Sequence, residues 1–175
     1  NLEPVTTVET GSRNVGIKAY QNYLIFSLMD KDQIWVLDAN KKYQVVKKIE
    51  NAGAMPFDAL IHQDTYMAGF YKEPGVGILR LSDMTYHKEA IMGPEKKPIL
   101  KIPHFGLWGV LGQNAYIPGT GQAQINVVDL KQMSFQRQID LPGFPVFVSR
   151  SPDQKHLAVN YSGDTENILS YFSVA

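Results

Sequence analysis

The stretch Gln33-Ile34-Trp35-Val36-Leu37-Asp38 is a short apolar segment that ends on an acidic residue just before a polar turn. The same pattern returns at Gly77-Ile78-Leu79-Arg80-Leu81-Ser82-Asp83 and at Gln124-Ile125-Asn126-Val127-Val128-Asp129. The acidic positions recur after 45 and then 46 residues. A period of about 40–50 residues is typical of one four-stranded propeller blade. The repeat therefore predicts an all-β fold, a β-propeller.

The segments between the repeats complete four blades. They are rich in β-branched and aromatic residues and are separated by turns of Asp, Asn, Gly, Ser and Pro, a pattern that predicts short strands. The charged stretch 83–97 is predicted to be an insertion within the second blade. We expect strands at 15–20, 23–28, 34–37 and 43–49; 57–61, 66–71, 76–81 and 99–102; 107–111, 115–118, 125–128 and 135–141; and 146–149, 156–161 and 168–172.

The two ends of the chain predict how the blades close. Residues 5–9 resemble an outermost strand without a blade of its own, and the last blade lacks its outermost strand. One interpretation is a closed four-bladed ring in which the first strand completes the last blade and removes two exposed edges. The favoured alternative is about half of an eight-bladed ring. In either case residues 1–175 form one domain, a closed or a partial propeller.

Composition excludes several classes of function. Lys and Arg together number 17, as do Asp and Glu, so no overall charge would attract nucleic acid. Cysteine is absent, which excludes disulfides, thiolate metal sites and a covalently attached c-type haem. No apolar run approaches the roughly 18 residues of a transmembrane segment, and no signal peptide opens the sequence. Binding is therefore expected at a local site.

The loops between blades carry the candidate site residues. In a propeller these loops lie near the axis, and here they hold Arg13, His104 and Phe144, with Lys18 and Trp108 on the strands that follow. Arg13 and Lys18 would pair with carboxylates, His104 would reach a metal or donate a proton, and the two aromatic rings would cover a planar ligand. The alternatives are an Arg13 that braces its loop, a structural His104 and a Trp108 in the core.

The remaining histidines give little evidence of a functional site. His62, His87 and His156 are predicted to be surface residues, and no paired spacing of His and carboxylates supports a metal site made by protein side chains alone.

Several longer motifs resemble the NirF family of haem d1 biosynthesis proteins, which are related to the haem-binding domain of cytochrome cd1 nitrite reductase. The resemblance covers nearly the whole chain. It is carried by residues 12–20 (SRNVGIKAY), 27–38 (SLMDKDQIWVLD), 55–59 (MPFDA), 66–70 (YMAGF), 102–104 (IPH) and 145–148 (PVFV).

The resemblance implies an eight-bladed, cytochrome cd1-type propeller in the periplasm. It implies non-covalent binding of haem d1 or a dihydro-haem d1 precursor, during cofactor maturation for nitrite reductase in denitrification. His104 matches a distal histidine of the reductase domain, as a catalytic residue or iron ligand, and Arg13 falls where a partner of an acidic side chain is expected. The reductase's second distal histidine is replaced by the segment Phe144-Pro145-Val146-Phe147, so a mechanism with two proton donors is not expected.

Three functions remain open at this point. The protein is a tetrapyrrole-modifying enzyme of late haem d1 synthesis, a haem d1 chaperone without catalysis, or a propeller scaffold that binds no haem. The partners implied are the tetrapyrrole, nitrite reductase or other haem d1 biogenesis proteins, and another fragment or a second copy of the chain.

Overall fold

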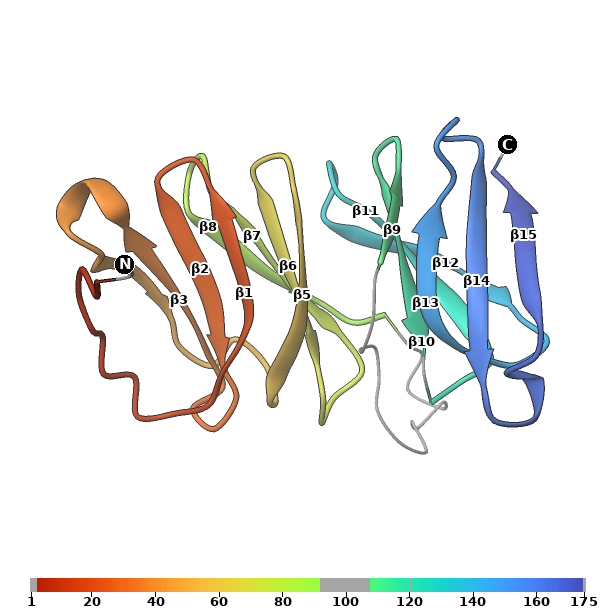
Figure 1. Cartoon of the computed structure of the whole chain (residues 1–175), viewed down its shortest axis with the longest axis horizontal. Coiled ribbons are helices and arrows are strands. Elements are labelled where there is room, and N and C mark those ends of the chain that lie inside the picture. The colour runs from red at the N-terminus through yellow and green to blue at the C-terminus, as the bar shows by residue number, and fades with distance from the viewer. Residues whose placement is uncertain (1–2, 92–107, 120, 175) are drawn as a thin grey trace.

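The computed structural model describes residues 3–91, 108–119 and 121–174, and within them it confirms an all-β fold (Figure 1). Consecutive strands pair antiparallel into four sheets, each a simple meander and each corresponding to one predicted blade. The strands are β1 Asn14–Tyr20, β2 Tyr23–Leu28, β3 Gln33–Asp38 and β4 Gln44–Ile49; β5 Pro56–His62, β6 Thr65–Phe70, β7 Val76–Arg80 and β8 Thr85–Glu89; β9 Gly109–Leu111, β10 Asn114–Gly119, β11 Gln124–Asp129 and β12 Ser134–Asp140; and β13 Phe144–Arg150, β14 His156–Ser162 and β15 Leu169–Ser173.

The repeated aspartate caps the turn that joins the third and fourth strands of a blade. Asp38 Oδ1 accepts a hydrogen bond from the amide of Asn40 at 2.9 Å, and Asp83 Oδ1 accepts one from the amide of Thr85 at 3.0 Å. Asp129 Oδ1 accepts from the amides of residues 131 and 132, each at 2.8 Å. A short carboxylate that bonds its own backbone two residues on stabilises such turns, which explains why the sequence repeats it.

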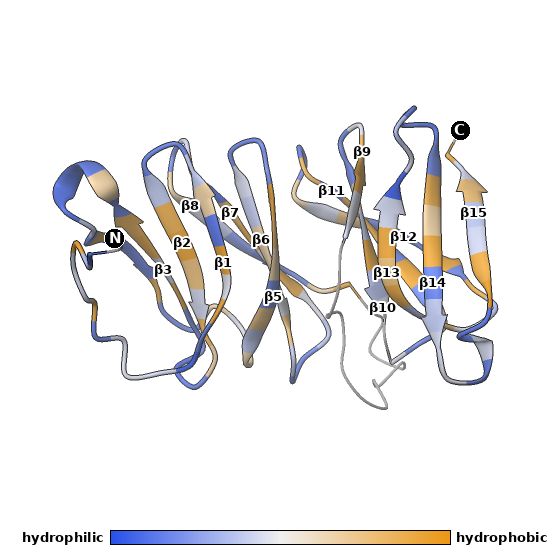
Figure 2. Cartoon of the chain, viewed as in Figure 1, coloured by the Kyte–Doolittle hydropathy of each residue, from blue (hydrophilic) through white to orange (hydrophobic). Residues whose placement is uncertain are grey.

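The hydrophobic core lies between neighbouring sheets. One cluster joins Ile25 and Val36 of the first blade to Tyr66 and Leu79 of the second, and further clusters join the second blade to the third and the third to the fourth. Apolar residues follow the middle strands, whereas the turns at both rims are polar (Figure 2). Each sheet is therefore stabilised by packing on its neighbours in the row, as in a propeller.

The blades stand in an open row, with the first and last sheets at opposite ends (Figure 1). The predicted strand at residues 5–9 does not form, and the segment does not complete the last blade. Instead Val8 packs on the outer face of the first sheet, against Phe26 and Trp35, and a groove of about 330 Å³ lies beside it. Apolar contacts with the adjacent sheet replace the strand pairing that the sequence suggested.

The second blade differs from the prediction in its outermost strand. That strand is β8, within the stretch expected to be an insertion, and the predicted strand 99–102 lies outside the described residues. Tyr86 is the reason that this charged segment forms a strand, because its ring packs into the core between the first two blades and its hydroxyl donates to the carbonyl of Ala52. Described helical structure is limited to two single 3₁₀ turns, Ala39–Lys41 and Gly163–Thr165.

Candidate functional site

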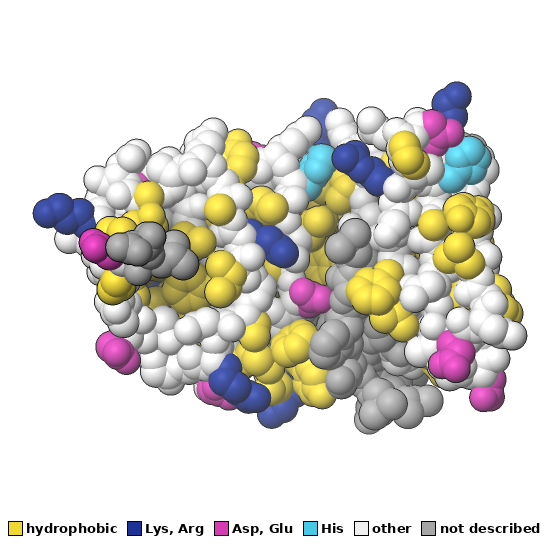
Figure 3. Space-filling view, viewed as in Figure 1, with side chains coloured by type: hydrophobic (Ala, Val, Ile, Leu, Met, Phe, Trp, Pro, Cys, Tyr) yellow, Lys and Arg dark blue, Asp and Glu magenta, His cyan; other side chains and the backbone are white. Residues whose placement is uncertain are grey.

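The innermost strands of the four blades line one pocket of about 390 Å³, here called the central cleft. It is lined by Lys18 of β1, Asp58 of β5, Trp108 just before β9 and Phe147 of β13, with residues 59–61 of β5. Acidic and basic side chains lie among apolar ones on the face that these strands form (Figure 3). All four blades contribute, although their residues are far apart in the sequence.

Backbone irregularities place the cleft residues. Three innermost strands, β1, β5 and β13, shift register against their partners close to where they begin. A bulge bends its strand and re-aims the side chains around it, and Lys18, Asp58 and Phe147 lie in or at the end of these irregular segments. The shifts fall between Val15 and Lys18, between Pro56 and Ala59, and between Pro145 and Phe147.

Gly16 and Tyr66 hold the first of these bulges against the second blade. Gly16 has φ +60°, and a Cβ there would lie 2.9 Å from both the Cβ of Ala59 and the carbonyl oxygen of Phe57. The Tyr66 hydroxyl donates to the carbonyl of Gly16 at 2.9 Å and lies 3.0 Å from Ser27 Oγ. Burial raises the pKa of Tyr66, so this phenol stays protonated and remains a donor.

The cleft combines one cation and one carboxylate with apolar walls. The Lys18 side chain is half-buried and makes no hydrogen bond or ion pair with the rest of the described chain. Asp58 Oδ1 accepts from the amide of Ala59 at 3.1 Å. Trp108 is 5% exposed and belongs to the core between the second and third blades, whereas Phe147 is 45% exposed. Such a surface suits a flat apolar ligand that carries an acidic group.

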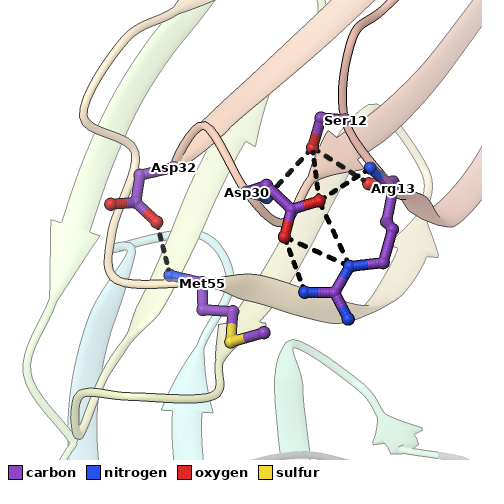
Figure 4. Close-up of polar contacts among 5 residues, drawn as sticks. All are labelled: Ser12, Arg13, Asp30, Asp32 and Met55. Carbon is purple, nitrogen blue, oxygen red and sulfur yellow. Dashed lines mark hydrogen bonds and ion pairs between the residues drawn. The ribbon is translucent and has the colours of Figure 1, made fainter.

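Arg13 braces its own loop (Figure 4). Its Nη2 and Nε donate to Asp30 Oδ1 at 2.6 and 3.1 Å, its amide donates to Oδ2 at 3.0 Å, and Ser12 Oγ accepts from the amide of Asp30 at 3.0 Å. These bonds hold the pKa of the Asp30 carboxyl well below its usual range and raise that of Arg13. Arg13 does not line the central cleft, and the structure therefore shows the loop-bracing arrangement left open above.

The other predicted residues divide between two places. Lys18 and Trp108 meet in the central cleft, although Trp108 presents little ring surface because it is nearly buried. Phe144 lines a separate pocket of about 450 Å³ with Gln122 and Asp140. His104 lies outside the described residues.

The sequence analysis missed three residues at this face. Phe147 lines the cleft in the place expected for Phe144, three positions later in the same strand. His62 and Arg150, at the ends of β5 and β13, line an adjoining pocket of about 200 Å³, here called the end pocket, which shares Leu60, Ile61 and Trp108 with the cleft. Their common signal is position in an innermost strand, which strand-by-strand alignment of the blades would have revealed.

The described residues lack both a side-chain metal site and a membrane-spanning helix. They contain no group of three or more His, Cys, Asp or Glu side chains placed to hold a metal ion. None of their helical segments has the length and apolar character needed to cross a membrane.

An open row of antiparallel blades, three with four described strands and one with three, and a cleft along the innermost strands define the fold of this chain as a propeller. Residues 3–171 match the family model described as the cytochrome D1 heme domain. The chain belongs to this family, which agrees with the resemblance found in the sequence.

Known proteins with related sequences or folds agree with this family assignment. Protein NirF of Stutzerimonas stutzeri is 30% identical over 171 residues, covering 91% of this chain and 44% of that protein. Protein NirF of Pseudomonas aeruginosa is 31% identical over 163 residues, covering 88% and 42%. The chain thus spans less than half the length of these relatives. The solved structure of dihydro-heme d1 dehydrogenase NirN in complex with DHE superposes with a TM-score of 0.71 at 16% identity, over 93% of this chain and 35% of NirN, and shows a shared fold.

Proposed function

We propose that this protein binds haem d1, or its dihydro-haem d1 precursor, non-covalently in the central cleft during cofactor maturation for nitrite reductase. The observation that carries the proposal is the cleft itself, in which Lys18 of the first blade lies beside Asp58 and apolar residues of the other three blades and makes no ion pair with any described residue. Membership of the cytochrome D1 heme domain family and similarity to NirF proteins support the choice of ligand. Denitrification in the periplasm is the setting that this proposal implies.

The described residues fit a tetrapyrrole. The central cleft of about 390 Å³ and the adjoining end pocket of about 200 Å³ share part of their lining, and small-molecule sites commonly measure about 300–1,000 Å³. Trp108, Leu60 and Phe147 offer apolar contact to a macrocycle, and Lys18 offers a charge-assisted hydrogen bond to one of its carboxylates. When bound, the haem would supply a redox-active iron. His104 is proposed beside that iron on the strength of the family resemblance.

A titration of haem d1 followed by visible absorption tests the proposal. Saturable binding with a shifted Soret band is expected. Lys18→Gln should weaken binding about three- to tenfold, as expected for one charge-assisted bond at a half-exposed site. Lys41→Gln is the control, because it removes the same charge from an exposed turn. Equal affinities of the two variants for haem d1 would show that Lys18 does not contact the ligand.

His104→Ala tests the proposed place of His104. The variant should change the position of the Soret band if this side chain lies at the iron, whereas an unchanged spectrum would place it elsewhere. Free-haem spectra with every folded variant would favour a propeller scaffold that binds no haem.

Catalysis and simple transfer can be distinguished by whether the spectrum of the bound ligand changes with time. A tetrapyrrole-modifying enzyme should change the spectrum of a bound dihydro-haem d1 precursor during incubation with an electron acceptor. A chaperone should hold the spectrum constant until nitrite reductase or another haem d1 biogenesis protein removes the ligand. A constant spectrum followed by transfer would therefore support the chaperone and exclude catalysis by this chain under those conditions.

We further propose that the open row is half of an eight-bladed ring. Large apolar side chains are exposed near both ends, including Ile17 at 55%, Leu169 at 54% and Tyr171 at 68%, and β15 is an edge strand. Such surfaces favour association, with a second copy or with further blades. Light scattering on the 19.6 kDa chain should give twice that mass. A monomer with a cooperative melt would contradict association of two copies.

A further inference from the structure

The end pocket lies between the second and fourth blades, at the rim where β5 and β13 end. His62 and Arg150 line it from opposite sides, with Ser149 beside Arg150 and with Trp108 and Val110 of the third blade between them. Its volume of about 200 Å³ is too small for a macrocycle, although it joins the central cleft through shared lining residues. It therefore suits one small group, free or attached to a larger ligand.

The two titratable side chains in the end pocket have no polar partner among the described residues. Neither side chain makes a hydrogen bond or ion pair there, and none of the described lining residues is a carboxylate. Ser149 adds a hydroxyl that makes no hydrogen bond within the described chain.

The acidic residues nearest in sequence are already engaged. Asp64 Oδ2 accepts from Ser82 Oγ at 2.6 Å, and its Oδ1 accepts from the hydroxyl of Thr65. Asp153 accepts from the hydroxyl of Ser151 and from the amide of Lys155 at 3.0 Å, and its Oδ2 lies 3.5 Å from His156 Nδ1. Both carboxylates thus stabilise their own turns, and Arg150, whose side chain is exposed at the mouth of the end pocket, forms no ion pair with a described carboxylate.

We infer that the end pocket binds an anion, a carboxylate or a small oxyanion. The Arg150 guanidinium presents a fork of N–H donors that matches two oxygens of such a group, and Ser149 and His62 can complete its hydrogen bonds. Trp108 and Val110 form an apolar wall on one side of the pocket. Two sources supply this chemistry: a free oxyanion, or an acidic side chain of a tetrapyrrole in the central cleft, which rests on the proposed function.

Two titrations distinguish these sources. Inorganic phosphate, followed by the amide chemical shifts of the whole chain, tests the free anion. Iron protoporphyrin IX and its dimethyl ester, followed by the Soret band, test an attached carboxylate. Arg150→Gln is the variant, and Arg137→Gln on the exposed outermost strand β12 is the control with the same loss of charge.

In the phosphate arm, saturable shifts at residues 62 and 149–150 that Arg150→Gln weakens about tenfold, and Arg137→Gln does not, would support a free-anion site. In the porphyrin arm, Arg150→Gln should weaken the free acid about tenfold and leave the ester unchanged, which would support an attached carboxylate. Equal behaviour of the two Arg variants in both arms would overturn the inference.

The phosphate arm contains no tetrapyrrole, so it remains informative if the porphyrin does not bind and the proposed function fails. His62→Gln provides a further check. A change in the position of the Soret band in this variant, without a change in affinity for phosphate, would show that His62 contacts iron rather than an anion and would also overturn the inference.

Discussion

Replacing Gly16 by Ala should destabilise the protein far more than the same change at Gly112. Both glycines have nearly the same left-handed backbone, with φ +60° and +59°. A Cβ at Gly112 would meet nothing within 4 Å, whereas at Gly16 it would lie 2.9 Å from the carbonyl oxygen of Phe57 and 3.1 Å from the hydroxyl of Tyr66. The pair separates the conformational cost of a left-handed Ala from the cost of crowding between two blades.

The magnitudes follow from these contacts. The left-handed conformation costs an L-residue about 1–2 kcal/mol, and this is the whole effect expected at Gly112. At Gly16 the β5 backbone must also move and the hydrogen bond from Tyr66 must weaken, which adds about 1–3 kcal/mol. Urea unfolding followed by tryptophan fluorescence measures both variants. With a slope of about 2 kcal/mol/M, the midpoints should differ by about 0.5–1.5 M. Coincident midpoints would refute the close approach of β1 and β5.

Tyr66→Phe should lower the free energy of unfolding by about 1–2 kcal/mol, because it leaves a buried Ser27 hydroxyl and the Gly16 carbonyl without their shared partner; an unchanged urea midpoint would contradict this. Asp30→Asn should lower the melting temperature at pH 7. Because the pKa of folded Asp30 lies below its unfolded value of about 3.9, the stability that it contributes is present above that value and is lost as the pH falls further. The melting temperatures of wild type and variant should therefore converge below about pH 4, and a constant difference down to pH 2 would show that Asp30 acts other than through its charge.

The sequence predicted the middle of each blade better than its outer edge. The apolar strands that precede the Asp-capped turns were located within one or two residues, because their side chains pack between sheets and their pattern is strong. β8 was missed because an outermost strand needs only one anchoring side chain. Tyr86 provides that anchor, and the charged residues around it lack the apolar pattern that predicts a strand. The segment at 5–9 was misassigned because its alternation fits both strand pairing and packing on a sheet.

The site was predicted less completely because its side chains are oriented by bulges. Phe144 was chosen for its place in the loop between two blades, and the sequence does not reveal that the register of β13 shifts between Pro145 and Phe147, where Phe147 lines the cleft. Arg13 was chosen for its place in a loop, and nothing in the spacing revealed that Asp30, 17 residues later, would occupy its guanidinium. Lys18 was chosen as a possible partner of a carboxylate on the first strand, and the structure places it in the cleft at the end of a bulge that contains Gly16. If the bulge in β1 orients Lys18 into the cleft, the lysine should lose its effect when it is moved by one position. The double variant Lys18→Ala, Ala19→Lys makes this change at constant net charge and should abolish the contribution of the lysine to haem d1 binding. Retained affinity would mean that the charge of Lys18 acts at long range and that the bulge does not position it.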